Sequence, residues 1–139
     1  MKNQHDLAEG WFRKGNSDIQ TIQVLLKAGG PYDAACFHAQ QAVEKYLKGF
    51  IELHGEVAPR IHDLVELNSR CISRNATWEI EGSVLSELTN YAVESRYQLE
   101  FCPDQKIASE ALSSVQQICQ VILAEQKRLK TIQEDPKDD

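Results

Sequence analysis

The sequence has no hydrophobic run long enough to cross a bilayer and no excess of positive charge. A membrane-spanning helix needs about 20 mostly apolar residues, whereas the uninterrupted apolar runs of this chain are short. Its 15 Lys and Arg are outnumbered by 21 Asp and Glu, which gives a formal net charge of -6. No general positive field therefore attracts nucleic acid or anionic lipid, so a site for a polyanion has to be local.

Several short functional motifs are also missing. The N-terminus has no apolar signal segment, so we expect a cytoplasmic protein. The four cysteines are widely spaced and include no Cys-x-x-Cys pair, which favours reduced, mostly buried thiols. The four histidines lack the His-x-x-x-His and Glu-x-x-His spacings of helical metal sites, so we predict no metal and no cofactor. The glycine-rich phosphate loops and the Gly-x-Ser-x-Gly elbow are absent, which excludes the common nucleotide and hydrolase folds that use them.

The residues that are present predict a single helical domain. A chain of 139 residues that is 42% hydrophobic and 26% charged has the size and composition of one globular domain. Apolar residues recur at helical spacing in five segments, and no segment alternates as a strand would. The expected helices cover residues 6–28, 31–54, about 61–72, 80–97 and 104 onward.

We therefore expect an all-α, up-and-down bundle of four to five helices. The domain is predicted to span residues 5–130, and residues 131–139 are predicted to form a flexible acidic tail. Pro31 suits the first turn of the second helix, and the third helix is expected to begin near His62. Trp78 and Tyr91 are expected in the core rather than on a dimer surface.

A polar stripe lies beside the apolar face of the second helix. At 100° per residue, five of its side chains fall within about 80° of the helix surface. They are His38, Gln41, Lys45, Lys48 and Glu52. One interpretation is a solvated flank supported by the spacing of Glu44 and Lys48. The other is a strip that contacts an anion or a nucleotide.

Two further groups of residues stand at helix ends. Arg60 and His62 occur together where a loop meets the third helix, and free backbone N–H groups at such a junction favour a phosphate or carboxylate. A histidine at a helix start can equally be structural. Arg96 and Tyr97 end the fourth helix, where the guanidinium either neutralises the last carbonyls or, with the aromatic ring, holds a base and its phosphate.

Four stretches of sequence together resemble the HEPN domain family. The first is the helix that contains Trp11 and Asp18, and the second is the run 34–48, which contains Gln-Gln-Ala-x-Glu-Lys-x-Leu-Lys. The others are Pro59–Leu64 and Ser95–Tyr97. The similarity extends over approximately residues 5–130. It implies a five-helix bundle that binds nucleotides, usually as a homodimer, and that is encoded in prokaryotes beside a minimal nucleotidyltransferase, often as a toxin–antitoxin pair. Many relatives have Thr or Ser at the position of Ile61, so the resemblance also implies a missing hydroxyl cap there.

The resemblance bears on catalysis as well. Many HEPN proteins are metal-independent RNases whose signature is an Arg followed four to six residues later by His. Arg96 occupies a matching position, but residues 97–103 contain no His. Our first hypothesis is therefore a noncatalytic binding module for a nucleotide or a nucleotidyltransferase partner. The alternatives are an endoribonuclease toxin in which Arg96 stabilises charge and His62 moves the proton, or a structural dimeric adaptor.

The binding hypothesis predicts a definite set of residues. The predicted nucleotide-binding residues are His38, Gln41, Lys45, Lys48, Arg60, His62, Arg96 and Tyr97. We further expect Lys45, His62 and Arg96 to meet in one shared recess, since a pocket for an anion needs only local positive potential in a protein whose net charge is negative.

Overall fold

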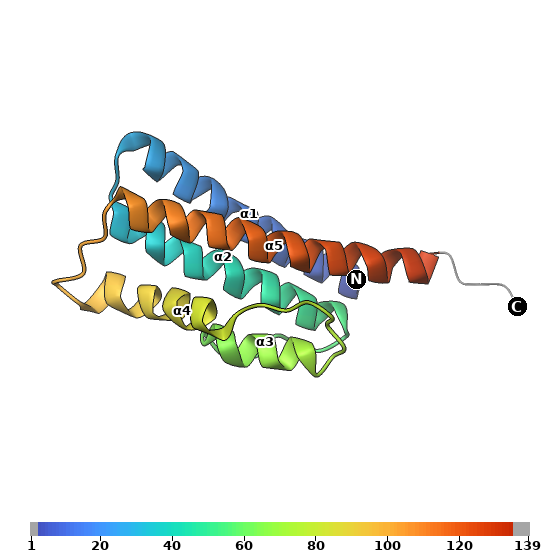
Figure 1. Ribbon diagram of the computed structural model, residues 1–139. Coiled ribbons are helices and arrows are strands. Elements are labelled where there is room, and N and C mark those ends of the chain that lie inside the picture. The colour runs from blue at the N-terminus through green and yellow to red at the C-terminus, as the bar shows by residue number, and fades with distance from the viewer. Residues whose placement is uncertain (1–2, 135–139) are drawn as a thin grey trace, which may run out of the picture.

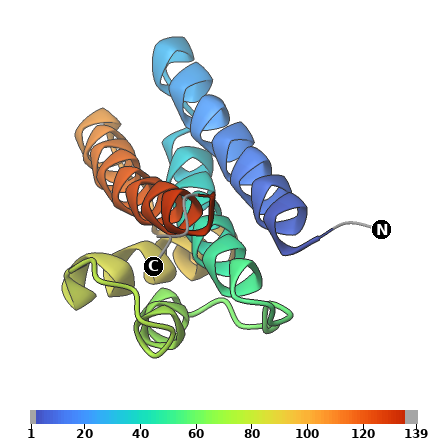
Figure 2. The ribbon, with the colours of Figure 1, turned by 90° about the vertical axis from the view of Figure 1, so that its right-hand side faces the viewer.

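The computed structural model describes residues 3–134, and within this range the chain forms five α-helices and no strand. The helices are α1 (Gln4–Ala28), α2 (Tyr32–Leu53), α3 (Leu64–Ile72), α4 (Gly82–Tyr97) and α5 (Gln105–Glu134). The long helices α1, α2 and α5 lie side by side, and α3 and α4 cover another side of α2 (Figures 1 and 2). This arrangement confirms the expected all-α bundle. None of the described helices has the length and apolar character needed to span a membrane.

α2 is the central helix because all four other helices pack against it. Its broad apolar face was evident from the sequence, and residues such as Val43, Leu47 and Phe50 are fully buried. Trp78 is also buried, as expected, and its ring meets that of Phe50 edge-on at 4.7 Å. Tyr91 is only partly buried and packs against the core.

Two glycines allow α1 and α2 to approach closely. A Cβ atom at Gly15 would lie 2.6 Å from Cδ1 of Tyr46, and one at Gly49 would lie 2.7 Å from Cε1 of Phe12. Real Cβ atoms do not come so near to other heavy atoms, so both positions require glycine, which has no Cβ atom. The close contact brings polar residues of α1 within hydrogen-bond distance of α2.

The starts of α2 and α3 differ from the sequence prediction. Pro31 is the N-cap of α2 and does not lie in its first turn. α3 begins at Leu64, two residues after His62, because Asp63 caps it by accepting a hydrogen bond from Val65 N at 2.9 Å. This carboxylate supplies the cap that was expected to be missing at Ile61.

The end of the chain is helical further than predicted. The flexible tail was predicted to begin at residue 131, but α5 extends to Glu134, so residues 131–134 are helical. Residues 135–139 lie outside the described residues. All four cysteines are free, and only Cys102 is exposed.

Candidate functional site

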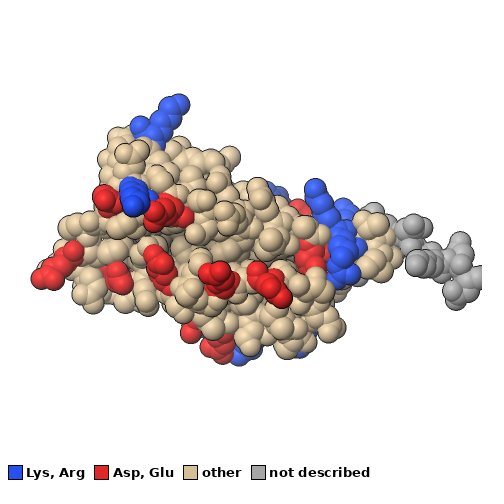
Figure 3. Space-filling model, viewed as in Figure 1, with Lys and Arg blue, Asp and Glu red and all other residues tan. Residues whose placement is uncertain are grey.

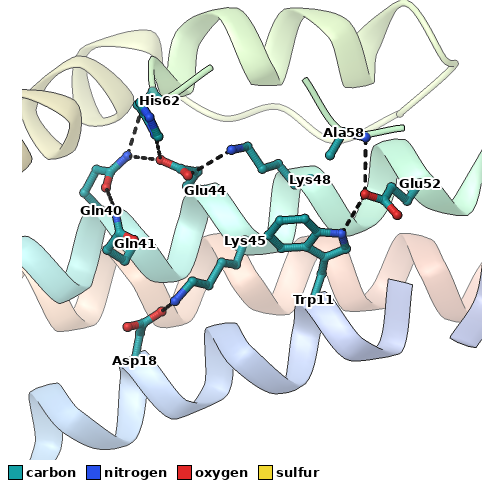
Figure 4. Close-up of polar contacts among 10 residues, drawn as sticks. All are labelled: Trp11, Asp18, Gln40, Gln41, Glu44, Lys45, Lys48, Glu52, Ala58 and His62. Atoms are coloured by element: carbon teal, nitrogen blue, oxygen red, sulfur yellow. Dashed lines mark hydrogen bonds and ion pairs between the residues drawn. The ribbon is translucent and has the colours of Figure 1, made fainter. Parts of the chain in front are cut away.

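Two buried carboxylates organise the polar stripe of α2. Asp18 on α1 and Glu44 on α2 are each only 6% exposed. Removing a carboxylate from water is costly unless hydrogen bonds and a counter-charge replace the lost solvation. Each carboxylate has both, and the partners are the cations and imidazoles that the sequence had singled out. Figure 4 shows most of these contacts around α2.

Asp18 holds the first cluster. Its Oδ1 lies 2.8 Å from Nδ1 of His38, and its Oδ2 accepts a hydrogen bond from Nζ of Lys45 at 2.6 Å. Both partners project from α2 toward α1, so this cluster ties the two helices together on one side of the stripe. His38 and Lys45 are therefore oriented by a carboxylate that sequence reasoning did not place among the site residues.

Glu44 holds the second cluster. Its Oε2 accepts a hydrogen bond from Nζ of Lys48 at 3.0 Å. Its Oε1 accepts a hydrogen bond from Nε2 of Gln40 at 2.8 Å and lies 3.0 Å from Nδ1 of His62. The Gln40 amide also donates to the backbone carbonyl of His62 at 3.0 Å, which fixes the loop before α3. His62 reaches the stripe from the side opposite Asp18 (Figure 4).

The surroundings of Glu44 keep it ionised. Burial by itself raises the pKa of this carboxyl group, but the hydrogen bonds from Gln40, Lys48 and His62 and the charge of Lys48 outweigh burial and lower the pKa below its ordinary value. An ionised carboxylate accepts hydrogen bonds only, so Nδ1 of His62 is the donor in their contact. The His62 side chain is 76% exposed, and the contact with Glu44 uses only one of its two ring nitrogens.

Lys48 is not the surface cation that the stripe suggested. It is 6% exposed, and its ammonium lies between the Glu44 carboxylate and the ring of Trp11, whose centroid is 5.8 Å away. The Trp11 indole donates to Oε2 of Glu52 at 2.8 Å, and the same oxygen accepts from Ala58 N at 3.2 Å. Lys48 and Glu52 thus fasten α1 and the loop after α2.

Arg96 contacts Phe37, which in turn contacts His38 of the stripe. Its guanidinium carbon lies 5.4 Å from the centre of the Phe37 ring and 5.3 Å from that of Tyr97. Phe37 in turn meets the ring of His38 edge-on at 5.4 Å. Arg96 also donates from Nε to the carbonyl of Ala92 at 3.1 Å, which agrees with the structural role considered for a cation in the last helical turn.

Lys45, His62 and Arg96 therefore do not meet in the one shared recess that the sequence had predicted. Lys45 and His62 bind separate carboxylates on two sides of α2, and Arg96 approaches through Phe37. Gln41 is close to the second cluster and donates to Gln40 at 2.7 Å. The hollows on the surface of the described residues are lined by other side chains, on and around α4 and α5.

The start of α3 also differs from the anion site that we expected. Leu64 N donates to Oγ1 of Thr89 at 3.1 Å, and Val65 N donates to Asp63. These backbone groups already have acceptors, so an anion at this junction would contact side chains instead. Arg60 is exposed and has no ion pair or hydrogen bond with a side chain in residues 3–134.

Sequence reasoning missed Asp18, Gln40 and Glu44 as parts of the site. The spacing of Glu44 and Lys48 was a signal, but it was interpreted as support for an exposed flank. Asp18 gave a weaker signal, as a lone carboxylate beside apolar residues of the first helix. Among the described residues, no group of three or more His, Cys, Asp or Glu side chains is placed to hold a metal ion.

A comparison with protein families gives one match. The model of the HEPN domain matches residues 8–128, which include both carboxylate clusters and all the predicted site residues. The chain belongs to the HEPN domain family. Comparisons with curated proteins and with solved structures found no match. The HEPN match begins within α1 and ends within α5, so it includes residues of all five helices.

Proposed function

We propose that this HEPN domain is a binding module for a nucleotide. The observation that carries the proposal is the pair of buried carboxylates, which hold two lysines and two histidines in fixed positions on both sides of α2. These contacts hold α1, α2 and the loop before α3 in a fixed arrangement, and a preorganised site loses less conformational freedom on binding a ligand than a mobile one does.

The charges decide which groups would contact the phosphates. Lys45 and Lys48 are already neutralised by Asp18 and Glu44. The spare cationic donors are the exposed guanidinium groups of Arg60 and Arg96. Tyr97, which is 68% exposed, offers an aromatic surface for a base beside the Arg96 guanidinium.

Calorimetric titration with ATP and GTP tests this proposal. We expect Arg60→Ala and Arg96→Ala each to weaken binding by about tenfold or more, since each removes a charge-assisted contact. Arg70→Ala is the matched control, because Arg70 is an exposed arginine on α3 that pairs with Glu66 at 3.3 Å, away from the stripe. The proposal is wrong if neither nucleotide gives heat with the wild type, or if all three variants bind equally well.

One observation favours a second candidate, a metal-independent endoribonuclease. Glu44 orients Nδ1 of His62 at 3.0 Å and leaves Nε2 toward solvent, which is how a carboxylate prepares a histidine for proton transfer. In this reaction His62 takes the proton of a ribose 2′-hydroxyl, and the 2′-oxygen attacks the adjacent phosphorus. The bond from phosphorus to the 5′-oxygen breaks, which leaves a 2′,3′-cyclic phosphate, and the 5′-oxygen takes a proton from water. Arg96 would stabilise the charge on the phosphorane oxygens.

The RNase candidate is tested with labelled RNA in the presence of EDTA. Cleavage by the wild type that is lost in His62→Ala and Arg96→Ala, and is kept in Arg70→Ala, would support it. Equal background cleavage in all samples would reject it. The cleavage products distinguish the two candidates, because a binding module leaves the RNA intact.

Partners are a separate part of the proposal. The resemblance to HEPN proteins suggests a homodimer and a minimal nucleotidyltransferase as companion in a toxin–antitoxin-like system. Exposed apolar side chains at the end of α4 support self-association: Val93 is 48%, Tyr97 68% and Leu99 99% exposed. Sedimentation of the wild type and of Leu99→Glu tests the dimer. A dimer that binds no nucleotide would favour the adaptor interpretation, and purification from the native host with identification of bound proteins tests the companion enzyme.

A further inference from the structure

A groove runs between α4 and α5, away from the polar stripe. α4 packs against α2 and α3, and α5 packs against α2 and α1, but α4 and α5 make little direct contact with each other. In Figure 1, α5 runs above and α4 below, with α2 visible between them. The groove contains a hollow of about 340 Å³ near the start of α4 and a smaller one of about 100 Å³ further along.

The first two hollows form one continuous channel. Val84 on α4 and Ser114 on α5 line both of them. Tyr91 lines the second hollow and stacks on Phe101 at 5.7 Å, and Phe101 lines a third hollow of about 380 Å³. The third hollow shares no lining residue with the first two, but all three include residues of α4 or of the segments next to it. The row of hollows therefore runs along α4, whose 16 residues span about 24 Å at the rise of an α-helix.

The channel has an apolar floor and an acidic rim. Val84, Leu88 and Ile118 contribute apolar surface. The acidic residues that line the three hollows are Glu79, Glu81, Glu87, Glu94, Glu100 and Glu110. None of the residues lining these hollows is Lys or Arg. Figure 3 shows a row of acidic side chains across the face that α4 and α5 present.

We propose that this groove docks a cationic amphipathic helix of a partner protein. An amphipathic helix places its apolar residues at i, i+3, i+4 and i+7 along such a channel. Lys and Arg side chains on its flanks would then meet Glu81, Glu87 and Glu110 on the two rims. Complementary charge of this kind speeds association and excludes partners of the wrong sign.

The same charge argues against two other occupants. A second copy of the chain would bring the same acidic groove, and juxtaposed like charges oppose association. The C-terminal residues 135–139 contain three Asp and one Lys, so they have the wrong sign for this rim. The groove shares no residue with the polar stripe, so the docking proposal stands or fails independently of nucleotide binding.

Fluorescence anisotropy with labelled peptides tests the proposal on the full chain. The probes are peptides of about 16 residues, matching the length of α4, with Leu and Ile on one helical face and Lys on its flanks. The controls are a scrambled peptide of the same composition and a peptide with Glu in place of Lys. We expect the cationic amphipathic peptides to bind at least about tenfold more tightly than either control, and the affinity to fall as salt is added.

Two adjacent serines of α5 provide matched variants. Ser114 lines both hollows, so Ser114→Arg fills the channel and adds a positive charge; we expect it to weaken peptide binding by about tenfold or more. Ser113 is exposed and lines none of the hollows, so Ser113→Arg adds the same charge elsewhere and should leave binding unchanged. Equal binding by both variants would overturn the proposal.

A charge reversal on the rim gives a second test that does not disturb the core. Glu110 is exposed, so Glu110→Lys should leave the fold intact and weaken the cationic peptides, whereas Glu66→Lys on α3 should not. Absence of binding by every cationic peptide, or equal binding of the Glu-containing peptide, would overturn the proposal. So would sedimentation that shows a wild-type dimer abolished by Ser114→Arg, because the occupant would then be a second copy.

Discussion

Glu44 and His62 are 18 residues apart in the chain, yet Oε1 of the buried glutamate lies 3.0 Å from Nδ1 of the exposed histidine. The contact depends on α2, which presents Glu44, and on the loop before α3, which Gln40 fastens through the His62 carbonyl. A buried carboxylate thus determines the orientation of a surface imidazole. The same carboxylate neutralises Lys48, so its removal affects both the stability of the domain and the geometry of its candidate site.

Replacement of Glu44 by glutamine should be strongly destabilising. Glu44→Gln removes the negative charge that faces the buried ammonium of Lys48, and loss of one partner of a buried pair typically costs about 3–5 kcal/mol. Glu66→Gln is the control, because Glu66 forms an exposed pair with Arg70, and such pairs contribute about 0–1 kcal/mol. Urea denaturation of the two variants measures the difference. Equal free energies of unfolding would show that the Glu44 cluster contributes little to stability.

The lowered pKa of Glu44 predicts loss of stability in acid. Burial raises the pKa, and the hydrogen bonds from Gln40, Lys48 and His62 together with the Lys48 charge bring it below the ordinary value of 4.5. A group whose pKa is lower in the folded state stabilises the fold above its ordinary pKa, and this contribution disappears as the pH falls through the lowered value. The difference in unfolding free energy between wild type and Glu44→Gln should therefore be constant above pH 4.5 and shrink below it. A difference that stays constant down to pH about 3 would contradict this assignment.

The fold was accessible from the sequence because helical periodicity is a local property. The apolar residues of the second helix, among them Val43, Leu47 and Phe50, recur at the spacing that buries one face, and all are buried in the structure. Helix ends were harder to place. Asp63 caps α3 because its side chain accepts a hydrogen bond from Val65 N. Sequence spacing does not show which of several neighbouring polar residues forms such a cap.

The site was predictable only in part because ion pairing is a tertiary property. The sequence identified His38 and Lys45, but their partner Asp18 comes from another helix, and helical spacing alone does not pair residues of two helices. Lys48 was predicted as a surface contact, whereas the structure buries it beside Glu44. Periodicity places a side chain on a face of its own helix, and the neighbouring elements decide whether that face is solvated.

The close approach of α1 and α2 predicts opposite effects for two glycines of α1. Gly15→Ala places a Cβ 2.6 Å from Tyr46 and 3.2 Å from the carbonyl of Ala42, so the helices have to separate. Overpacking of this kind typically costs about 1–3 kcal/mol. No atom lies within 4 Å of a Cβ at Gly10, so Gly10→Ala should stabilise the helix by up to about 1 kcal/mol. Thermal unfolding followed by circular dichroism should show Tm falling for the first variant and rising for the second, and a rise for both would contradict the close packing.

The thiols should differ sharply in reactivity. Burial, together with nearby acidic groups, raises the pKa of Cys36 to about 12, and burial raises that of Cys71 to about 12. Burial likewise raises the pKa of Cys119. Because the thiolate is the reactive form, these three groups are protected both by packing and by protonation. Cys102 is exposed on the connection between α4 and α5. An aromatic disulfide reagent at neutral pH should therefore modify one thiol rapidly in the native protein and all four in urea, and Cys102→Ser should abolish the rapid phase. Rapid modification of a second thiol in the native protein would mean that the core around α2 opens on the timescale of the reaction.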